Sequence, residues 1–162
     1  MADPRGGRSA DAASRHAARE RALELLYEVE SKGQTVPAVL AELPMVPDEH
    51  AVELVEGVER RGEEVDGFVS RFAKGWSVGR MPAVDRAVLR LGTYELLASS
   101  HVPTAVVLSE WVTLAGEYST TDSSRFVNGV LSRIAQEIRP DDAGNAGAAG
   151  TGDRPDGGDP AP

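Results

Sequence analysis

The stretch Ser124-Arg125-Phe126-Val127-Asn128-Gly129-Val130-Leu131 combines a cation, an aromatic ring and an Asn-Gly pair inside a strongly apolar segment. Between Phe126 and Ile138, apolar side chains recur at the three- and four-residue spacing of one helix face. Pro140 ends the pattern, and Thr121 or Asp122 is a suitable N-cap. The segment therefore predicts an amphipathic helix that packs one face into a core.

Two features of this helix bear on function. Phe126 follows the cap closely, and an exposed ring beside Arg125 would offer a single-stranded base a stacking surface and a phosphate partner. Packing of Phe126 into the core is the alternative, and periodicity alone favours it. Gly129 costs about 1 kcal/mol relative to alanine inside a helix, which indicates close approach of a neighbouring helix.

The remaining periodicity is also helical. Val102–Leu108 could be a strand bounded by proline, but no second strand is predicted to pair with it. The sequence therefore predicts an all-α fold, a single-domain bundle of about six or seven helices. Other expected helices cover about Asp11–Glu30, Val36–Glu42, Pro82–Ala98 and a segment from Pro103 through Leu114. Between the second and third of these, a helix capped by Asp48 is expected to break or kink at Gly62 and then to continue to about Lys74.

Composition divides the 162-residue chain into three parts. Residues 140–162 contain no aromatic or large aliphatic side chain, so we expect a disordered acidic tail. Residues 1–10 are expected to form a disordered N-terminal arm, and residues 11–139 the helical domain. Five arginines against three acidic residues give residues 1–22 a charge of +2, whereas residues 23–139 carry −7 and residues 140–162 carry −4.

Several classes of function lack support in the sequence. The chain has no cysteine, which excludes disulfides and thiol chemistry and is typical of a cytoplasmic protein. No apolar run approaches the ~20 residues that span a bilayer, and no secretory signal is found. His16, His50 and His101 show no metal spacing, and there is no phosphate-binding loop or nucleophile elbow. We expect neither an enzyme nor a metal or cofactor.

The basic start of the chain is a second candidate for binding. Arg15 and Arg19 are four residues apart and share a helix face, with His16 beside them. Near a helix N-terminus such cations repel the helix dipole, and an incoming phosphate would relieve that repulsion. Simple solubility, with pairing to nearby glutamates, explains the same pattern equally well.

Four segments share a pattern in chain order: the arginine-rich run 15–27 that ends in Leu-Tyr, residues 84–97, residues 110–114, and Phe126-Val127-Asn128-Gly129-Val130-Leu131. Together they resemble the NusB family of transcription antitermination factors. The resemblance implies an all-helical RNA-binding protein that joins the small-subunit ribosomal protein also called NusE. With it, family members bind single-stranded boxA RNA in nascent ribosomal RNA transcripts and help the transcription elongation complex pass terminators.

The resemblance also assigns roles to residues. It implies that Arg15, His16 and Arg19 hold RNA phosphates, and that Arg125 and Phe126 meet the RNA with Asp122 nearby. Asp85 and Glu95 become candidates for the surface that meets the basic ribosomal protein. We expect the opening arginines and the last helix to converge on one corner of the bundle. The chain departs from the family pattern at His16, where an arginine is usual, at Ser109, where asparagine is usual, and at Gly116, where lysine is usual.

Two alternatives remain open. A helical adaptor could use the Arg15 row to bind an acidic protein partner without specific RNA binding. A NusB-like domain also accompanies some RNA methyltransferases, but we expect no catalytic domain here because the sequence continues only into the acidic segment. The sequence does not distinguish a monomer from a homodimer, since an apolar helix face serves either.

Overall fold

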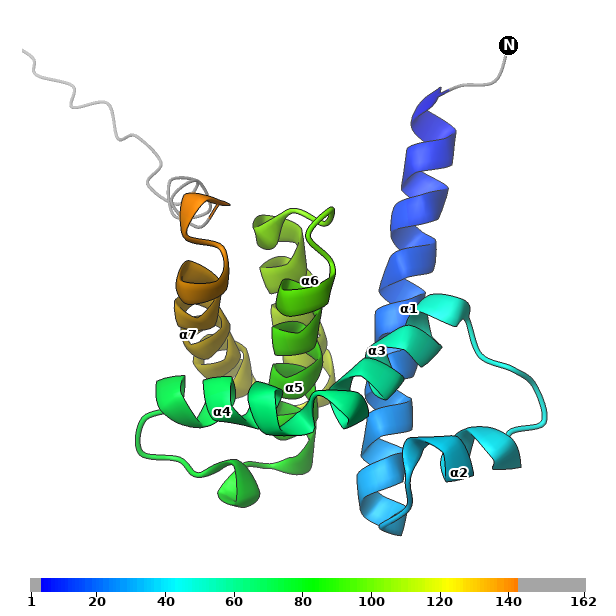
Figure 1. Ribbon diagram of the computed structural model, residues 1–162. Coiled ribbons are helices and arrows are strands. Elements are labelled where there is room, and N and C mark those ends of the chain that lie inside the picture. Colours follow the sequence, from blue (N-terminus) through cyan, green and yellow to red (C-terminus); the bar gives the residue numbers. More distant parts are fainter. Residues whose placement is uncertain (1–3, 143–162) are drawn as a thin grey trace, which may run out of the picture.

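The computed structural model describes residues 4–142, and all regular elements in that range are helical (Figure 1). The prediction of an all-α bundle is confirmed. Residues 1–3 and 143–162, which include most of the predicted tail, lie outside the described residues. In order, the elements are α1 (Pro4–Lys32), α2 (Val36–Glu42), α3 (Glu49–Arg60), α4 (Gly62–Phe72), the 3-10 turn η1 (Val78–Arg80), α5 (Ala83–Ala98), α6 (Thr104–Tyr118) and α7 (Thr121–Ile138).

The helix ends follow local side-chain chemistry. The Asp48 carboxylate accepts a hydrogen bond from the backbone N–H of His50 at 2.8 Å and so caps α3, as predicted. Thr120 caps α7 by accepting from the N–H of Ser123 at 3.0 Å, so the predicted cap at Thr121 or Asp122 is one or two residues late. The start of α1 is also corrected, from Asp11 to Pro4. Residues 7–15 are exposed, so no apolar pattern in the sequence could reveal the first turns of α1.

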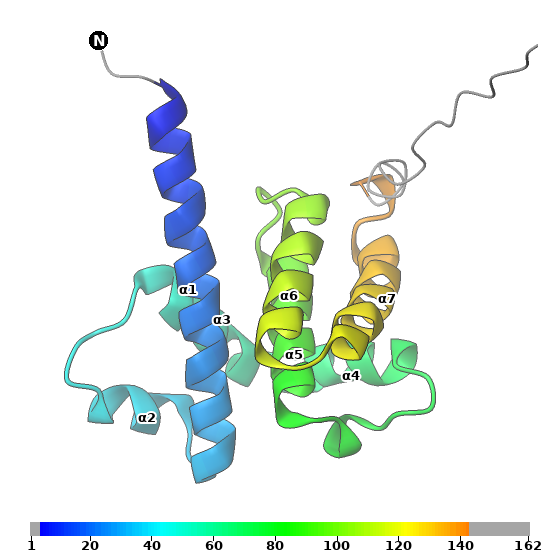
Figure 2. The ribbon, with the colours of Figure 1, turned by 180° about the vertical axis from the view of Figure 1, so that it is seen from behind.

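The bundle has two flanks around a central pair of helices. Both views show α5 and α6 standing between α1 on one side and α7 on the other (Figures 1 and 2). α1 packs against α3 and α5, whereas α7 packs against α4, α5 and α6. The core between them includes the fully buried side chains Trp111, Leu54, Leu89, Leu96, Leu131 and Ile134. Among residues 4–142 no helix is long and apolar enough to cross a bilayer.

Glycine allows close packing at a different place from the one expected. A Cβ atom at Gly129 would meet only the Arg133 side chain, at an ordinary 3.6 Å, so the predicted approach of a neighbouring helix there is wrong. At Gly57 a Cβ atom would lie 1.9 Å from the Tyr94 ring. Gly57 in α3 therefore makes room for Tyr94 of α5, which is 3 % exposed.

The end of α7 fixes the connection between α5 and α6. The Arg139 guanidinium donates hydrogen bonds to the carbonyls of Leu96, Ser99 and Val102 at 3.0, 2.8 and 2.7 Å. These bonds satisfy carbonyl groups at the C-terminal end of α5 and in the turn that follows. The Asp142 carboxylate accepts from the N–H and hydroxyl of Thr104 at 3.2 and 2.6 Å, at the start of α6.

Candidate nucleic-acid interface

The first turns of α7 place a cation beside two aromatic rings. Arg125 is exposed, and Phe126 is half-buried against the core. The Phe126 ring meets Trp76, from the α4–α5 connection, edge to face, with centroids 5.3 Å apart and planes at 89°. Trp76 is 42 % exposed. Asp122 is also exposed, so the predicted residues Asp122, Arg125 and Phe126 share this surface.

Asp85 lies beneath the start of α7. It is 1 % exposed, so the predicted role of Asp85 in a partner-binding surface is wrong. The hydroxyl of Ser123 donates to Asp85 Oδ2 at 3.0 Å, while Oδ1 has no hydrogen-bond partner among the described residues. This carboxylate therefore joins the first turn of α5 to the first turn of α7 and helps to place the Phe126 surface.

Arg19 and Glu95 form an ion pair inside the bundle. They are 2 % and 0 % exposed. Arg19 Nε lies 3.1 and 3.0 Å from the two Glu95 oxygens, and Nη2 donates to Oε1 at 2.6 Å. The Trp111 indole N–H donates to Glu95 Oε2 at 2.7 Å. The predictions that Arg19 holds RNA phosphate and that Glu95 meets a protein partner are therefore wrong, because their charged groups are enclosed and satisfy one another.

The other two residues of the basic row are at the surface but have acidic neighbours. The Arg15 side chain is 44 % exposed, and its Nε lies 3.4 Å from Asp11. His16 is one-third exposed, and its Nδ1 lies 2.5 Å from the Glu110 carboxylate of α6. The hydrogen bond to Glu110 raises the pKa of His16 above its ordinary value. His16 therefore joins α1 to α6 as a partly charged surface pair.

The two predicted clusters do not form one corner. Arg15 borders a hollow that is also lined by His101, which lies just before the first residue of α6. Arg125 lies in the first turns of α7, which begins just after the last residue of α6. That helix has 15 residues, which corresponds to about 22 Å along its axis. The expected convergence of the opening arginines with the last helix is therefore wrong.

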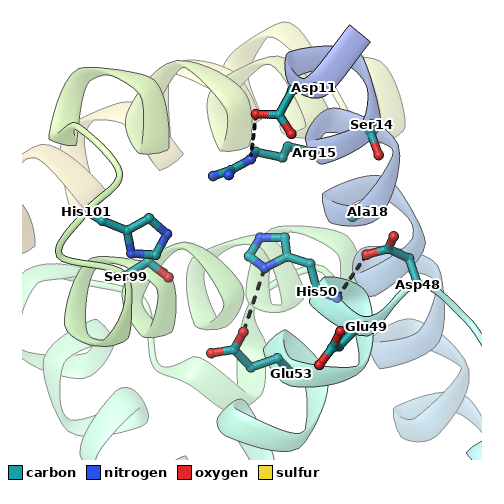
Figure 3. A pocket seen from close by; sticks show the side chains of 10 residues that line it. All are labelled: Asp11, Ser14, Arg15, Ala18, Asp48, Glu49, His50, Glu53, Ser99 and His101. Carbon is teal, nitrogen blue, oxygen red and sulfur yellow. Dashed lines mark hydrogen bonds and ion pairs between the residues drawn. The ribbon is translucent and has the colours of Figure 1, made fainter. Parts of the chain in front are cut away.

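The hollow beside Arg15 has a volume of 390 Å³ and lies between α1, α3 and the α5–α6 connection (Figure 3). Arg15, His50 and His101 line it, but so do four carboxylates, Asp11, Asp48, Glu49 and Glu53. The lining has more carboxylates than permanently charged cations, so the hollow is a poor site for a phosphate at neutral pH. Among residues 4–142 no group of histidine and carboxylate side chains is arranged to hold a metal ion.

Sequence reasoning missed an apolar surface on the α1 flank. Tyr27 and Tyr118 are 48 % and 40 % exposed, and with Leu23 and Val84 they line a hollow of 230 Å³. We call these four residues the tyrosine surface. The Tyr118 hydroxyl donates to Glu20, and this bond raises the pKa of Tyr118 to about 12. The signal in the sequence was Tyr27, a large aromatic residue at the end of an apolar stripe.

Comparison with known proteins identifies the family. Residues 16–136 match the sequence model of the NusB family. The chain belongs to the NusB family. It is 45 % identical over 138 residues to the transcription antitermination protein NusB of Streptomyces avermitilis, covering 79 % of this chain and 94 % of that one. It is 49 % identical over 129 residues to NusB of Saccharopolyspora erythraea, covering 75 % and 86 %.

Solved structures agree with this assignment. NusB of T. maritima superposes with a TM-score of 0.71 at 34 % identity, over 81 % of this chain and 96 % of that one. A structure of antitermination factors NusB and NusE in complex with double-stranded RNA matches with a TM-score of 0.66 at 30 % identity, over 76 % and 96 %. NusB-family members thus share this helical arrangement.

Proposed function

We propose that this NusB-family chain is a non-enzymatic transcription antitermination factor of the cytoplasm. It binds the single-stranded boxA element of ribosomal RNA transcripts together with the ribosomal protein NusE. The observation that carries the proposal is Arg125, an exposed cation without a hydrogen bond or ion pair among the described residues, next to the half-buried ring of Phe126. Phe126 opens the segment Phe126–Leu131 that resembles the family, and Arg125 directly precedes it.

Each group at the start of α7 has a physical role in this proposal. The Arg125 guanidinium is free to form charge-assisted hydrogen bonds with a phosphate. The accessible part of the Phe126 ring contacts a base. Asp122, in the same exposed turn, repels the backbone of the RNA and limits its affinity. Arg15 and protonated His16 add a weaker phosphate contact on the α1 flank, because Asp11 and Glu110 already neutralise part of their charge.

The partner surface is reassigned within this proposal. We place NusE on the tyrosine surface, because exposed aromatic rings around an apolar hollow are typical of protein interfaces. Glu20 and Glu24 lie beside it, and their charge complements a basic ribosomal protein. One of the superposed structures contains a NusB with a NusE, which supports the proposed pairing.

The proposal is tested by titrating boxA-like RNA and a scrambled RNA, with and without NusE, at two salt concentrations. We expect Arg125→Ala to weaken binding of the boxA-like RNA and to lower the salt slope by about 0.7. Arg133→Ala is the matched control, because Arg133 is an exposed arginine of α7 whose Nε donates to the Gly129 carbonyl of its own helix. Equal affinity for the two RNAs under all conditions would contradict the proposal.

A further inference from the structure

The basic side chains of the described chain differ in whether they have a partner. Most are engaged: Arg61 with Glu64, Arg71 with Glu137 and Arg90 with Asp66, each at 2.6 or 2.7 Å. The side chains of Lys74, Arg80 and Arg125 are exposed and make no hydrogen bond or ion pair within residues 4–142. In a chain with a net charge of −9, cations without carboxylate partners mark a surface suited to an anion.

All three of these cations are close in sequence to Trp76 or Phe126, the two rings that contact each other. Lys74 and Arg80 lie two residues before and four residues after Trp76, in the α4–α5 connection. Arg125 is adjacent to Phe126, whose ring contacts Trp76. We call Lys74, Trp76 and Arg80 the connection cluster. Because the Trp76 ring contacts Phe126, the connection cluster adjoins the surface at the start of α7.

Trp76 is displayed by an anchored piece of backbone. The N–H of Trp76 donates to the carbonyl of Ala73 at 3.2 Å, after Gly75 adopts a positive φ of 84° that favours glycine. The N–H of Arg80 donates to the Ser77 carbonyl at 2.9 Å, and Met81 is 3 % exposed in the core. The indole is therefore held at the surface at little further ordering cost, which favours binding.

We propose that the connection cluster is a second RNA-binding segment. Trp76 stacks on a base of single-stranded RNA, while Lys74 and Arg80 bind the flanking phosphates. The strand runs on from the nucleotides held by Arg125 and Phe126, so the inference rests on the proposed function and extends its site. An exposed indole with adjacent cations is the combination that unpaired nucleotides require, since every base presents a π-face and every linkage a negative charge.

The test uses the full chain, a fluorescent boxA-like single-stranded RNA and anisotropy titrations without NusE. We expect Trp76→Ala to weaken binding about tenfold or more, and Trp76→Phe to retain most of the affinity because a ring remains. Removing both cations in Lys74→Ala/Arg80→Ala should reduce the salt slope by about 1.4. Met45→Ala and Lys32→Ala/Arg61→Ala are the controls, since they remove an exposed apolar side chain and two ion-paired surface cations elsewhere.

A spectroscopic readout separates stacking from structural damage. Stacking of a base should quench the emission of exposed Trp76, whereas Trp111 is fully buried, so Trp76→Phe should abolish the quenching. Thermal melting of each variant confirms that it is folded.

The outcomes distinguish this inference from the function on which it rests. One outcome is that Arg125→Ala and Phe126→Ala weaken RNA binding, whereas the connection-cluster variants bind RNA like the parent and Trp76→Phe leaves the fluorescence quenching unchanged. That outcome overturns the inference, and the proposed function stands. If none of these variants changes binding, the proposed function fails together with it. Loss of NusE binding with unchanged RNA binding in Trp76→Ala would also overturn the inference, and would assign Trp76 to a protein interface.

Discussion

Arg19 in the interior and Arg125 at the start of α7 both lie near aromatic side chains, with opposite consequences. In the interior, Arg19 and the Trp111 indole both bond the Glu95 carboxylate, and the three side chains are at most 2 % exposed. At the start of α7, Arg125 directly precedes Phe126 of the Phe126–Trp76 pair and has no carboxylate partner among residues 4–142. The comparison shows that the role of an arginine depends on whether the fold brings a carboxylate to it. An arginine with an enclosed partner holds helices together, and one without a partner can bind a phosphate.

The largest loss of stability is expected when one partner of the buried Arg19–Glu95 ion pair is removed. Arg19→Ala leaves the Glu95 carboxylate buried without its cation, which should lower the free energy of unfolding by about 3–5 kcal/mol. Urea denaturation followed by circular dichroism measures the change. Arg15→Ala is the control, because its surface pair with Asp11 contributes only about 0–1 kcal/mol. Equal stability of the two variants would show that the interior network has no structural role.

A smaller effect is expected at the indole of the same network. Trp111→Phe removes the N–H that bonds Glu95 and leaves one carboxylate lone pair without a donor, at a cost of about 1–3 kcal/mol. Trp76→Phe makes the same change at the surface and should alter stability by less than about 0.5 kcal/mol. Both values come from one set of urea titrations. A larger loss in Trp76→Phe than in Trp111→Phe would reverse the proposed division between the two regions.

At the surface, a substitution should weaken RNA binding without changing the stability of the fold. Arg125→Ala should leave the free energy of unfolding within about 0.5 kcal/mol of the parent, since the exposed guanidinium makes no hydrogen bond or ion pair with residues 4–142. The dissociation constant for boxA-like RNA should nevertheless rise, by roughly fivefold for a lost contact of about 1 kcal/mol. Calorimetric titration beside thermal melting checks both. A destabilised variant with unchanged RNA affinity would assign Arg125 to the fold.

The smallest effect concerns pH. The bond to Glu110 raises the pKa of His16, and the charges of Glu117 and Glu20 act in the same direction. Protonated His16 therefore stabilises the fold at a pH below the unfolded pKa of about 6.5, and this contribution is lost as the pH rises through the higher folded pKa. Between pH 6 and pH 8 the parent should lose stability relative to His16→Gln. Parallel pH profiles of unfolding would show that the pair contributes nothing.

The fold followed from the sequence where local chemistry dictates it. The α2 range Val36–Glu42, the Asp48 cap and the break at Gly62 were all predictable, because proline, glycine and capping side chains act on neighbouring backbone. The first turns of α1 were not, because their side chains are exposed and leave no periodic signal. The layout of α1 and α7 on opposite flanks depends on contacts between distant segments, which periodicity does not report.

The site was predictable only in part, for a related reason. Arg19 precedes Ala22, Leu23 and Leu26 on a buried helix face, and Glu95 continues the apolar stripe of α5. Both positions therefore carried a sign of burial, but their pairing joins residues 76 positions apart. The contact of Trp76 with Phe126 is equally remote in sequence, so the exposed indole could not be assigned to the α7 surface before the fold was known.

Hydrogen–deuterium exchange of the full chain, with and without saturating boxA-like RNA, tests the location of the nucleic-acid surface most directly. We expect RNA to slow exchange in peptides covering residues 73–82 and 120–128, with a weaker change around residues 11–18. Peptides of the interior network on α5 and α6 should exchange as before. Protection confined to α2 and α3, with none at the start of α7 or in the α4–α5 connection, would show that RNA binds elsewhere on the bundle.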